Sequence, residues 1–226
     1  MKKLLSIIIV LGMVSVTSVL ANGVEIISEF KVTNSYLYRG LSFATPDEEV
    51  FLPAVVFIVG DDLEIVTYGA LGIGDDPYNE WGFEAKKSFF GHLEILASGF
   101  IWRLDDASSW DKGFITGAKG FFEAGGIELA GGFLWGTDQD IPEFKGFYYY
   151  ASASKPSVIL GIDIAVEVGY NAGFYSEGKG ALALFDFSRA FKVWNTNLIF
   201  GLTIPLVNKE VNPLEPGPAL NIKLAW

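Results

Sequence analysis

Apolar and polar residues alternate in short segments along most of the chain. In the segment 158–170, Ile162, Ile164 and Val166 share one face while Asp163 and Glu167 share the other. A period of two residues is typical of a β-strand whose two faces meet different surroundings. The segment 217–226 alternates in the same way. The pattern therefore predicts an all-β protein.

Segments of this kind recur along the chain, each close to the ~9–11 residues of a tilted membrane-spanning strand. About twelve are predicted, at 28–39, 49–59, 63–73, 80–89, 92–103, 112–122, 126–135, 144–154, 158–170, 178–188, 192–206 and 217–226. Pro53 falls inside the second segment, although proline lacks the N–H that a strand ladder needs.

Short turns alternate with longer polar connections between the segments. The short turns are predicted at Gly60-Asp61-Asp62, Phe90-Gly91, Glu123-Ala124-Gly125, Lys155-Pro156 and the junction near Arg189-Ala190. The longer connections lie near 40–48, 74–79, 104–111, 136–143, 171–177 and 207–216. Short turns on one rim and longer loops on the other predict a transmembrane antiparallel up-and-down β-barrel, with its short turns in the periplasm. An even number of strands places both chain ends on that side.

A soluble β-sandwich is the alternative, because its strands also alternate. In a sandwich the apolar faces point inward and the charged faces meet water. Here the apolar faces are bulky and continuous, while the opposite faces mix small residues with isolated charges. That combination favours an outer surface in lipid and a narrow polar lumen.

The composition agrees with a barrel and excludes some classes of function. Half of the residues are apolar and the mean hydropathy is +0.35, yet beyond the first two dozen residues no apolar run approaches the ~20 residues of a spanning helix. Glycine and aromatic residues are frequent, as a curved sheet with interfacial aromatic belts requires. The net charge of −11 argues against nucleic-acid binding. The absence of cysteine excludes thiol chemistry, and no cofactor motif is present.

The first 21 residues have the organisation of a signal peptide. Lys2 and Lys3 precede an apolar stretch from Leu4 to Val14, and Val19-Leu20-Ala21 resembles a cleavage site. We therefore expect residues 1–21 to be removed on export, leaving a barrel over 22–226. An uncleaved N-terminal anchor is the alternative.

Two short motifs carry a resemblance to known proteins. The C-terminal Asn-Ile-Lys-Leu-Ala-Trp resembles the terminal signal of Gram-negative outer-membrane proteins, which implies recognition of Trp226 by the barrel-assembly machinery. The stretch from Ser35 to Ser42, followed by Pro53-Ala54, resembles the opening of a family of uncharacterised proteobacterial outer-membrane β-barrel proteins. The resemblance implies a fold and an outer-membrane location in contact with lipid. It implies no activity.

The polar faces of the segments define a predicted lumen. Its charged residues are Glu29, Lys31, Glu64, Glu84, Lys86, Glu94, Lys119, Glu128, Asp163, Glu167 and Lys223, with Arg39 at the outer end of the first segment. Acids outnumber bases, which favours a passive channel or narrow porin for small cationic or neutral hydrophilic solutes. Alternatively, these charges pair and fill the interior, leaving a closed barrel with a structural or loop-mediated binding role.

The remaining candidates for chemistry are weak. The only histidine, His92, falls at a predicted periplasmic turn, away from the outer rim where barrel enzymes carry a general base. The oxygen-rich stretches 74–79 and 105–106 do not have the spacing of a calcium loop. We expect neither catalysis nor a metal site. Tyr148-Tyr149-Tyr150 and the tryptophans near the predicted outer ends are interpreted mainly as an interfacial aromatic girdle.

Overall fold

The computed structural model describes most of the chain beyond the predicted signal peptide. The described residues are 23–35, 37–38, 41–42, 49–73, 78–103, 110–138, 145–174, 178–194, 196–207, 211 and 217–225. The predicted signal peptide, Arg39 and Trp226 lie outside these residues.

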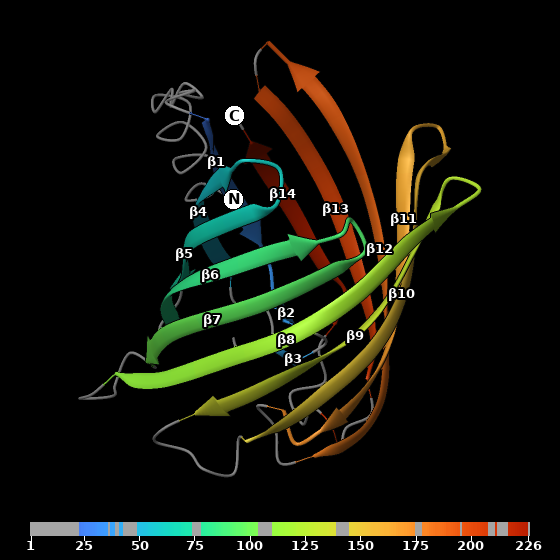
Figure 1. The fold of residues 1–226 in the computed structure, drawn as a ribbon. Coiled ribbons are helices and arrows are strands. Elements are labelled where there is room, and N and C mark those ends of the chain that lie inside the picture. The colour runs from blue at the N-terminus through green and yellow to red at the C-terminus, as the bar shows by residue number, and fades with distance from the viewer. Residues whose placement is uncertain are drawn as a thin grey trace.

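Twelve antiparallel strands close into one barrel, in which every strand pairs with its neighbours along the chain and β1 pairs with β14 (Figure 1). The strands are β1 (Val24–Thr33), β4 (Glu49–Val59), β5 (Leu63–Ile73), β6 (Asn79–Phe89), β7 (Leu93–Arg103), β8 (Asp111–Ala124), β9 (Ile127–Asp138), β10 (Gly146–Ile159), β11 (Ile162–Ala172), β12 (Lys179–Val193), β13 (Thr196–Val207) and β14 (Ala219–Ala225). Two short strands, β2 (Leu37–Tyr38) and β3 (Leu41–Ser42), form a separate hairpin. The predicted all-β barrel is confirmed. Within the described residues, no helix is long and apolar enough to cross a bilayer.

The short turns lie together at one end of the barrel. Phe90 and Gly91 turn the chain from β6 to β7 with φ angles of 56° and 69°. Gly60 donates a backbone hydrogen bond to the carbonyl oxygen of Gly23 (3.3 Å), so the start of β1 lies at this end. The hairpin of β12 and β13 extends furthest there (Figure 1). We call this end the short-turn end and the opposite one the long-loop end.

The first barrel strand was predicted at 28–39 but runs from Val24 to Thr33. Its early part pairs with the end of β4, so the ladder begins before the predicted start. The strand ends where Thr33 Oγ1 donates a hydrogen bond to the carbonyl oxygen of Ser35 (2.8 Å) and accepts one from the N–H of Ser35 (3.3 Å). A hydroxyl that bonds its own backbone in this way competes with the strand ladder.

Two of the predicted short turns are wrong. The strand predicted to end before Lys155-Pro156 continues as β10 to Ile159, and the turn lies at Leu160 and Gly161. A register shift between Lys155 and Ile159 absorbs the proline, because a bulge leaves a strand residue without its ladder bond. Arg189 lies within β12, opposite Phe200, and the turn follows at Trp194. Proline and a change in charge are therefore poor markers of a turn in this sheet.

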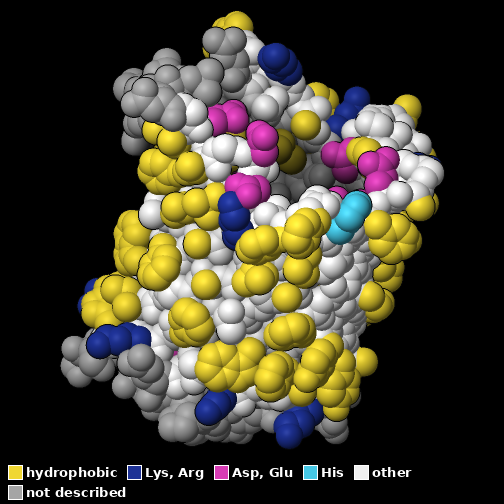
Figure 2. Space-filling model, in the orientation of Figure 1, with side chains coloured by type: hydrophobic (Ala, Val, Ile, Leu, Met, Phe, Trp, Pro, Cys, Tyr) yellow, Lys and Arg dark blue, Asp and Glu magenta, His cyan; other side chains and the backbone are white. Residues whose placement is uncertain are grey.

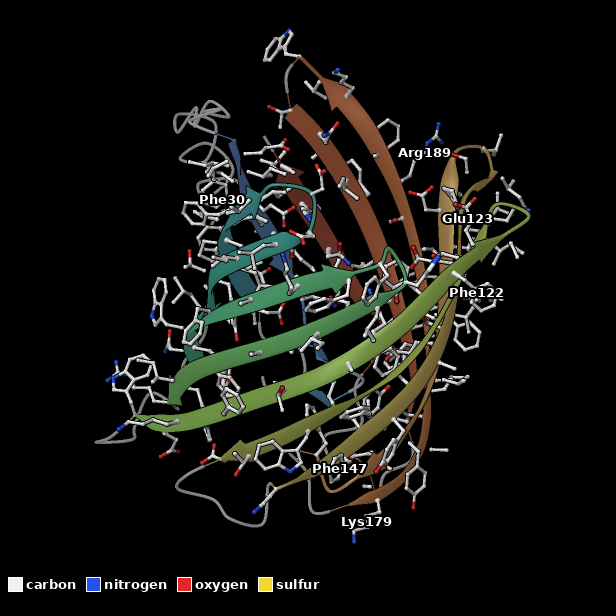
Figure 3. All side chains as sticks on the ribbon, in the orientation of Figure 1. Phe30, Phe122, Glu123, Phe147, Lys179 and Arg189 are labelled. Carbon is white, nitrogen blue, oxygen red and sulfur yellow. The ribbon has the colours of Figure 1, made fainter. Side chains whose placement is uncertain are left out.

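The outer surface of the barrel is apolar along its length. Phe122, 56% exposed, lies near the short-turn end, whereas Phe147, 39% exposed, lies near the long-loop end (Figure 3). Exposed apolar side chains spread over the wall between the two ends (Figure 2). An outer wall of this composition suits contact with lipid, because the barrel is closed and exposed apolar side chains cover the wall between its ends.

Glycines let aromatic side chains of adjacent strands lie flat against the wall. A Cβ atom at Gly82 would come within 2.5 Å of the Tyr68 ring, and one at Gly169 within 2.2 Å of the Tyr148 hydroxyl. These tyrosines face the lumen and cover the glycines from inside. This pairing of ring and glycine accounts for part of the high glycine content and reinforces the curved sheet.

Within the described residues, the seam between β1 and β14 is the shortest ladder of the barrel. Five described residue pairs join β1 to β14, from Glu29↔Ala225 to Thr33↔Asn221, whereas ten join β1 to β4. Asn34 extends the seam at the long-loop end. Its N–H donates to the carbonyl oxygen of Leu220 (3.2 Å), and its Oδ1 accepts the N–H of Leu220 (2.7 Å).

Candidate functional site: the barrel lumen

The described residues predicted to line the lumen all face the interior. Ten of them line three cavities along the barrel: Glu29, Lys31, Glu64, Glu84, Lys86, Glu94, Lys119, Glu128, Asp163 and Lys223. The eleventh, Glu167, is buried and lies deeper in the interior. Strand alternation places them there, because each lies at an inward position of its strand.

Ion pairs with nearby glutamates neutralise two of the lumen lysines, Lys86 and Lys119. Lys86 of β6 lies 2.9 Å from Glu64 of β5 and 2.8 Å from Glu84 of its own strand. The Glu94 and Lys119 side chains, which are opposite each other in the ladder of β7 and β8, are 3.4 Å apart. Cross-strand pairs of opposite charge are favourable at such positions. This part of the lumen is therefore charged but largely balanced.

Lys223 and Lys31 form an unbalanced group at the seam. Lys223 of β14 lies 2.6 Å from Glu29 of β1. Lys31 is directly opposite Lys223 in the ladder, on the same face of the sheet. Among the described residues, no carboxylate lies within ion-pair distance of Lys31. Glu29 and Asp186 offset part of the repulsion between Lys31 and Lys223, but the like charges still weaken the seam.

An acidic mouth opens at the short-turn end. A cavity of about 460 Å³ between β8 and β12 is lined by Glu123, Glu128, Asp163 and Asp186, and Lys155 is the one base among the described residues lining it. The acidic side chains gather around a hollow at this end of the molecule (Figure 2). Two of these carboxylates are oriented by hydrogen bonds, Asp163 from the Ser157 N–H (2.8 Å) and Asp186 from the Thr203 hydroxyl (2.5 Å).

The half of the lumen toward the long-loop end is filled with apolar side chains. Leu134, Tyr148, Phe174, Leu182 and Val211 pack in one cluster, and each is at most 4% exposed. We call this group, together with the other cluster members Leu96, Ile115 and Leu184, the lumen plug. Leu134 and Ile115 also line the cavities, so the cavities end on the plug. Among the described residues, the lumen thus opens toward the short turns and closes toward the loops.

Buried polar groups beside the lumen plug are held by hydrogen bonds. The Tyr148 hydroxyl donates to Glu167 (2.8 Å), and the Trp102 indole N–H donates to Asp138 (2.9 Å). Asn171 accepts hydrogen bonds from the N–H groups of Gly173 (2.9 Å) and Phe174 (2.7 Å). Because buried polar atoms without partners are costly, these contacts stabilise one arrangement of this half.

Sequence reasoning missed some lumen residues. Tyr148 was assigned to the outer girdle with its neighbours, but it is 1% exposed and faces inward, whereas Tyr149 is 48% exposed on the outside. The period of two residues could have separated them. Asp186 was not among the predicted lumen residues, and the structure places it in the lumen opposite Thr203.

The remaining candidate for chemistry within the described residues is His92. His92 is exposed at the turn between β6 and β7, at the short-turn end as expected. In the described part of the chain, no group of three or more histidine, cysteine, aspartate or glutamate residues could hold a metal ion. The stretches 74–77 and 105–106 lie outside the described residues.

Comparison with known proteins gives a likeness of fold. LpxR from Salmonella typhimurium superposes with a TM-score of 0.58 at 7% identity, over 88% of this chain and 99% of that chain. An outer-membrane channel from Pseudomonas putida F1 (TM-score 0.46, 13% identity, 94% and 98% of the two chains) and the translocator domain of the autotransporter NalP from Neisseria meningitidis (0.45, 9%, 91% and 88%) are more distant. No protein-family model matches the sequence, and no curated protein matches it.

Proposed function

We propose that this protein is a narrow channel for small cationic or neutral hydrophilic solutes in the outer membrane of a Gram-negative bacterium. The observation that supports the proposal is a charged, hollow lumen. Two cavities of about 390 and 610 Å³ share Glu84 as a lining residue, and charged side chains line both. A lumen built only for support would not need charged walls around open space, since small barrels are readily filled by side chains.

The acidic mouth sets the expected selectivity. Lys155 is the one base among the described residues that line this cavity, and four carboxylates outnumber it, so a cation is attracted and an anion repelled. Deeper in, paired charges offer hydrogen-bonding partners to polar solutes without a strong net field. In this proposal, the lumen plug is the narrowest part of the path.

A closed barrel is the second candidate, and the lumen plug favours it. Phe174 and Val211 are fully buried, as are the inward-facing Val50 and Ala70 on the other side of the lumen. If this packing persists in the membrane, the barrel conducts nothing, and its role is structural or depends on binding by its loops.

Single-channel conductance in a planar lipid bilayer separates the two candidates. We expect small, cation-favouring steps from the wild-type protein, and larger steps from L182A/L184A, which removes side chains from the lumen plug. L206A is the matched control, because Leu206 is 59% exposed on the outer surface of the same hairpin. A correctly folded protein that is silent both as wild type and as L182A/L184A would rule out the channel.

Ion selectivity tests the acidic mouth separately. D186N removes one charge from the cavity and nearly preserves the side-chain volume. In a potassium chloride gradient we expect its reversal potential to move toward that of a non-selective pore. A conducting barrel whose reversal potential is unchanged in both D186N and E128Q would remove the mouth from the permeation path.

We also propose that the protein reaches the membrane by cleavage after Ala21 and recognition of Trp226 by the barrel-assembly machinery. N-terminal sequencing of the protein from outer membranes should begin at Asn22. A mature protein that retains Met1 would contradict cleavage. Removal of Trp226 should reduce the amount of heat-modifiable barrel, and unchanged amounts would contradict its role as a signal.

A further inference from the structure

Basic side chains lie along the outer rim at the long-loop end of the barrel (Figure 2). Four of them follow one another around one half of this rim: Arg103 at the end of β7, Lys112 near the start of β8, Lys145 just before β10 and Lys179 at the start of β12. Arg103 and Lys112 face outward with Ile101, which is exposed and is opposite Lys112 in the ladder of β7 and β8. We call these four cations the basic rim.

Aromatic rings lie beside the basic rim on the same face of the wall. The Nζ atom of Lys145 is 5.9 Å from the centre of the Trp135 ring, and the Cζ atom of Arg103 is 4.9 Å from the centre of the Trp110 ring. A cation above a ring is attracted by the negative face of the ring. The Trp135 ring therefore holds the ammonium group of Lys145, an exposed residue, at the outer surface.

Further rings extend this face toward the middle of the wall. Trp135 packs edge-on against Phe114 of β8, with ring centres 6.5 Å apart, and is opposite Phe147 in the ladder of β9 and β10. The ring centre of Phe147, which lies near the long-loop end (Figure 3), is 6.4 Å from that of Phe133 and 5.8 Å from that of Tyr149. We call these five residues the aromatic patch. Its rings offer an apolar surface to acyl chains.

The described part of the protein does not neutralise the basic rim. Among the described residues, no carboxylate is within ion-pair distance of these four cations. Asp138, at the same end, faces inward and accepts the hydrogen bond of Trp102, and Asp111 is opposite Trp102 on that inward face. The Nε atom of Arg103 is buried and has no hydrogen-bond partner in the described structure. Cations without a counter-ion at a membrane surface attract anionic lipids.

Lys112 and Lys145 are near enough to share one head group. Lys112 lies two residues before Phe114, which is opposite Thr137 in the ladder of β8 and β9. Lys145 continues the ladder of β9 and β10 beyond Gly146, which places it beside Thr137. With ~4.8 Å between strands and ~3.4 Å per residue, the Cα atoms of the two lysines are roughly 12 Å apart. Both side chains are flexible stems that can converge on a phosphate between them.

We propose that the basic rim and the aromatic patch form a site for a phosphorylated lipid of the leaflet that surrounds the long-loop end. The phosphate lies between Lys112 and Lys145, and the acyl chains lie along the aromatic patch. Charge-assisted hydrogen bonds from the ammonium groups hold the phosphate, whose negative charge offsets the repulsion along the rim. The binding is non-covalent. It rests on the proposed membrane location but not on ion conduction, so a barrel that never conducts leaves it unaffected.

Native mass spectrometry of the full barrel in a mild detergent tests the site, with dioleoyl phosphatidic acid as the titrated lipid. We expect saturable binding, and at least tenfold weaker binding of dioleoylphosphatidylcholine, which has the same chains and a zwitterionic head group. K112Q/K145Q should weaken binding of phosphatidic acid about thirtyfold, because each basic residue beside an anionic lipid contributes about fivefold. K87Q is the matched control and should keep the wild-type affinity. Lys87 also has an outward position, near the short-turn end, but is already paired with Asp62.

Three outcomes would overturn the site. Equal affinity for the two lipids would mean that the charge of the head group does not matter. A heat-modifiable K112Q/K145Q protein with wild-type affinity would mean that these lysines do not hold the phosphate. Displacement of phosphatidic acid by an equal concentration of glycerol 3-phosphate, which has no acyl chains, would mean that the rim binds soluble phosphates and that the aromatic patch contributes nothing.

Fluorescence quenching tests where the lipid lies. The vesicles are phosphatidylcholine with a small fraction of phosphatidic acid brominated on its acyl chains, because bromine quenches an indole ring only in contact. We expect W135F to lower the quenched fraction of the tryptophan emission, and K112Q/K145Q to lower it while Trp135 is kept. W194F is the control, because Trp194 lies at the turn between β12 and β13, at the short-turn end. Equal losses in W135F and W194F would place the lipid away from the aromatic patch and overturn the proposal.

Discussion

Individual side chains of the lumen follow a simple rule of parity. In β11, Asp163 and Glu167 face inward while Val168 and Tyr170 are exposed outside. Parity could be read from the sequence, because alternate residues of a strand share one face. The partner of each charge could not be read from the sequence, because ion pairs such as that of Lys86 with Glu64 depend on the register between strands. Turn positions set that register, and two of them were wrong.

The hydrogen bond from Tyr148 to Glu167 gives a test at this scale. The pair is buried, and a hydrogen bond to a carboxylate contributes about 1.5–3 kcal/mol. We expect Y148F to lower the free energy of unfolding by that amount, measured by urea unfolding in lipid vesicles. Y149F, on the outer face of the same strand, should stay within about 0.5 kcal/mol of the wild type. Equal stability of Y148F and the wild type would show that the bond does not hold the lumen plug.

At the scale of strands, the wall depends on positions where only glycine fits. In β8, a Cβ atom at Gly117 would lie 2.3 Å from the carbonyl oxygen of Phe133, a backbone atom that cannot move away without distorting β9. At Gly120 of the same strand the nearest atom would be 3.9 Å away. The sequence shows both glycines but not their difference, because the difference arises from the neighbouring strand.

These two glycines form a matched pair for mutation. We expect G117A to destabilise the barrel by about 1–3 kcal/mol through overpacking, and G120A to have little effect. The measurement is the urea midpoint of each refolded variant, with heat modifiability on gels as the check of folding. If G120A lost as much stability as G117A, the cost would come from glycine loss in general and not from the contact with β9.

For the whole molecule, the lumen is asymmetric between its two ends. Ser188 lines the acidic mouth at the short-turn end, whereas Lys179 is exposed where β12 begins at the long-loop end (Figure 3). Composition and alternation predicted a polar lumen but left open whether it is hollow or filled. The structure contains a hollow part and a filled part. The filled part could not be predicted, because the plug residues come from strands and connections far apart in the sequence.

Labelling of single cysteines tests this asymmetry and the orientation in the membrane. In intact cells, a bulky water-soluble maleimide should modify K179C but not S188C. Permeabilising the outer membrane should make S188C reactive as well, and both variants should react fully after denaturation. Labelling of S188C in intact cells would mean that the short turns face outward or that the plug does not close the lumen.

The seam that Asn34 extends also determines when the barrel can be completed. Asn34 bonds Leu220 across a separation of 186 residues, and the adjoining seam pairs β1 with the last strand of the chain. Every other barrel ladder joins strands that are neighbours along the chain, so each can form as soon as its hairpin is present. The seam closes a loop of almost the full length of the chain. It therefore forms last, after β14 has been added. A chain truncated before Ala219 therefore leaves β1 and β13 with unpaired edges. Completion of the barrel thus depends on the last strand.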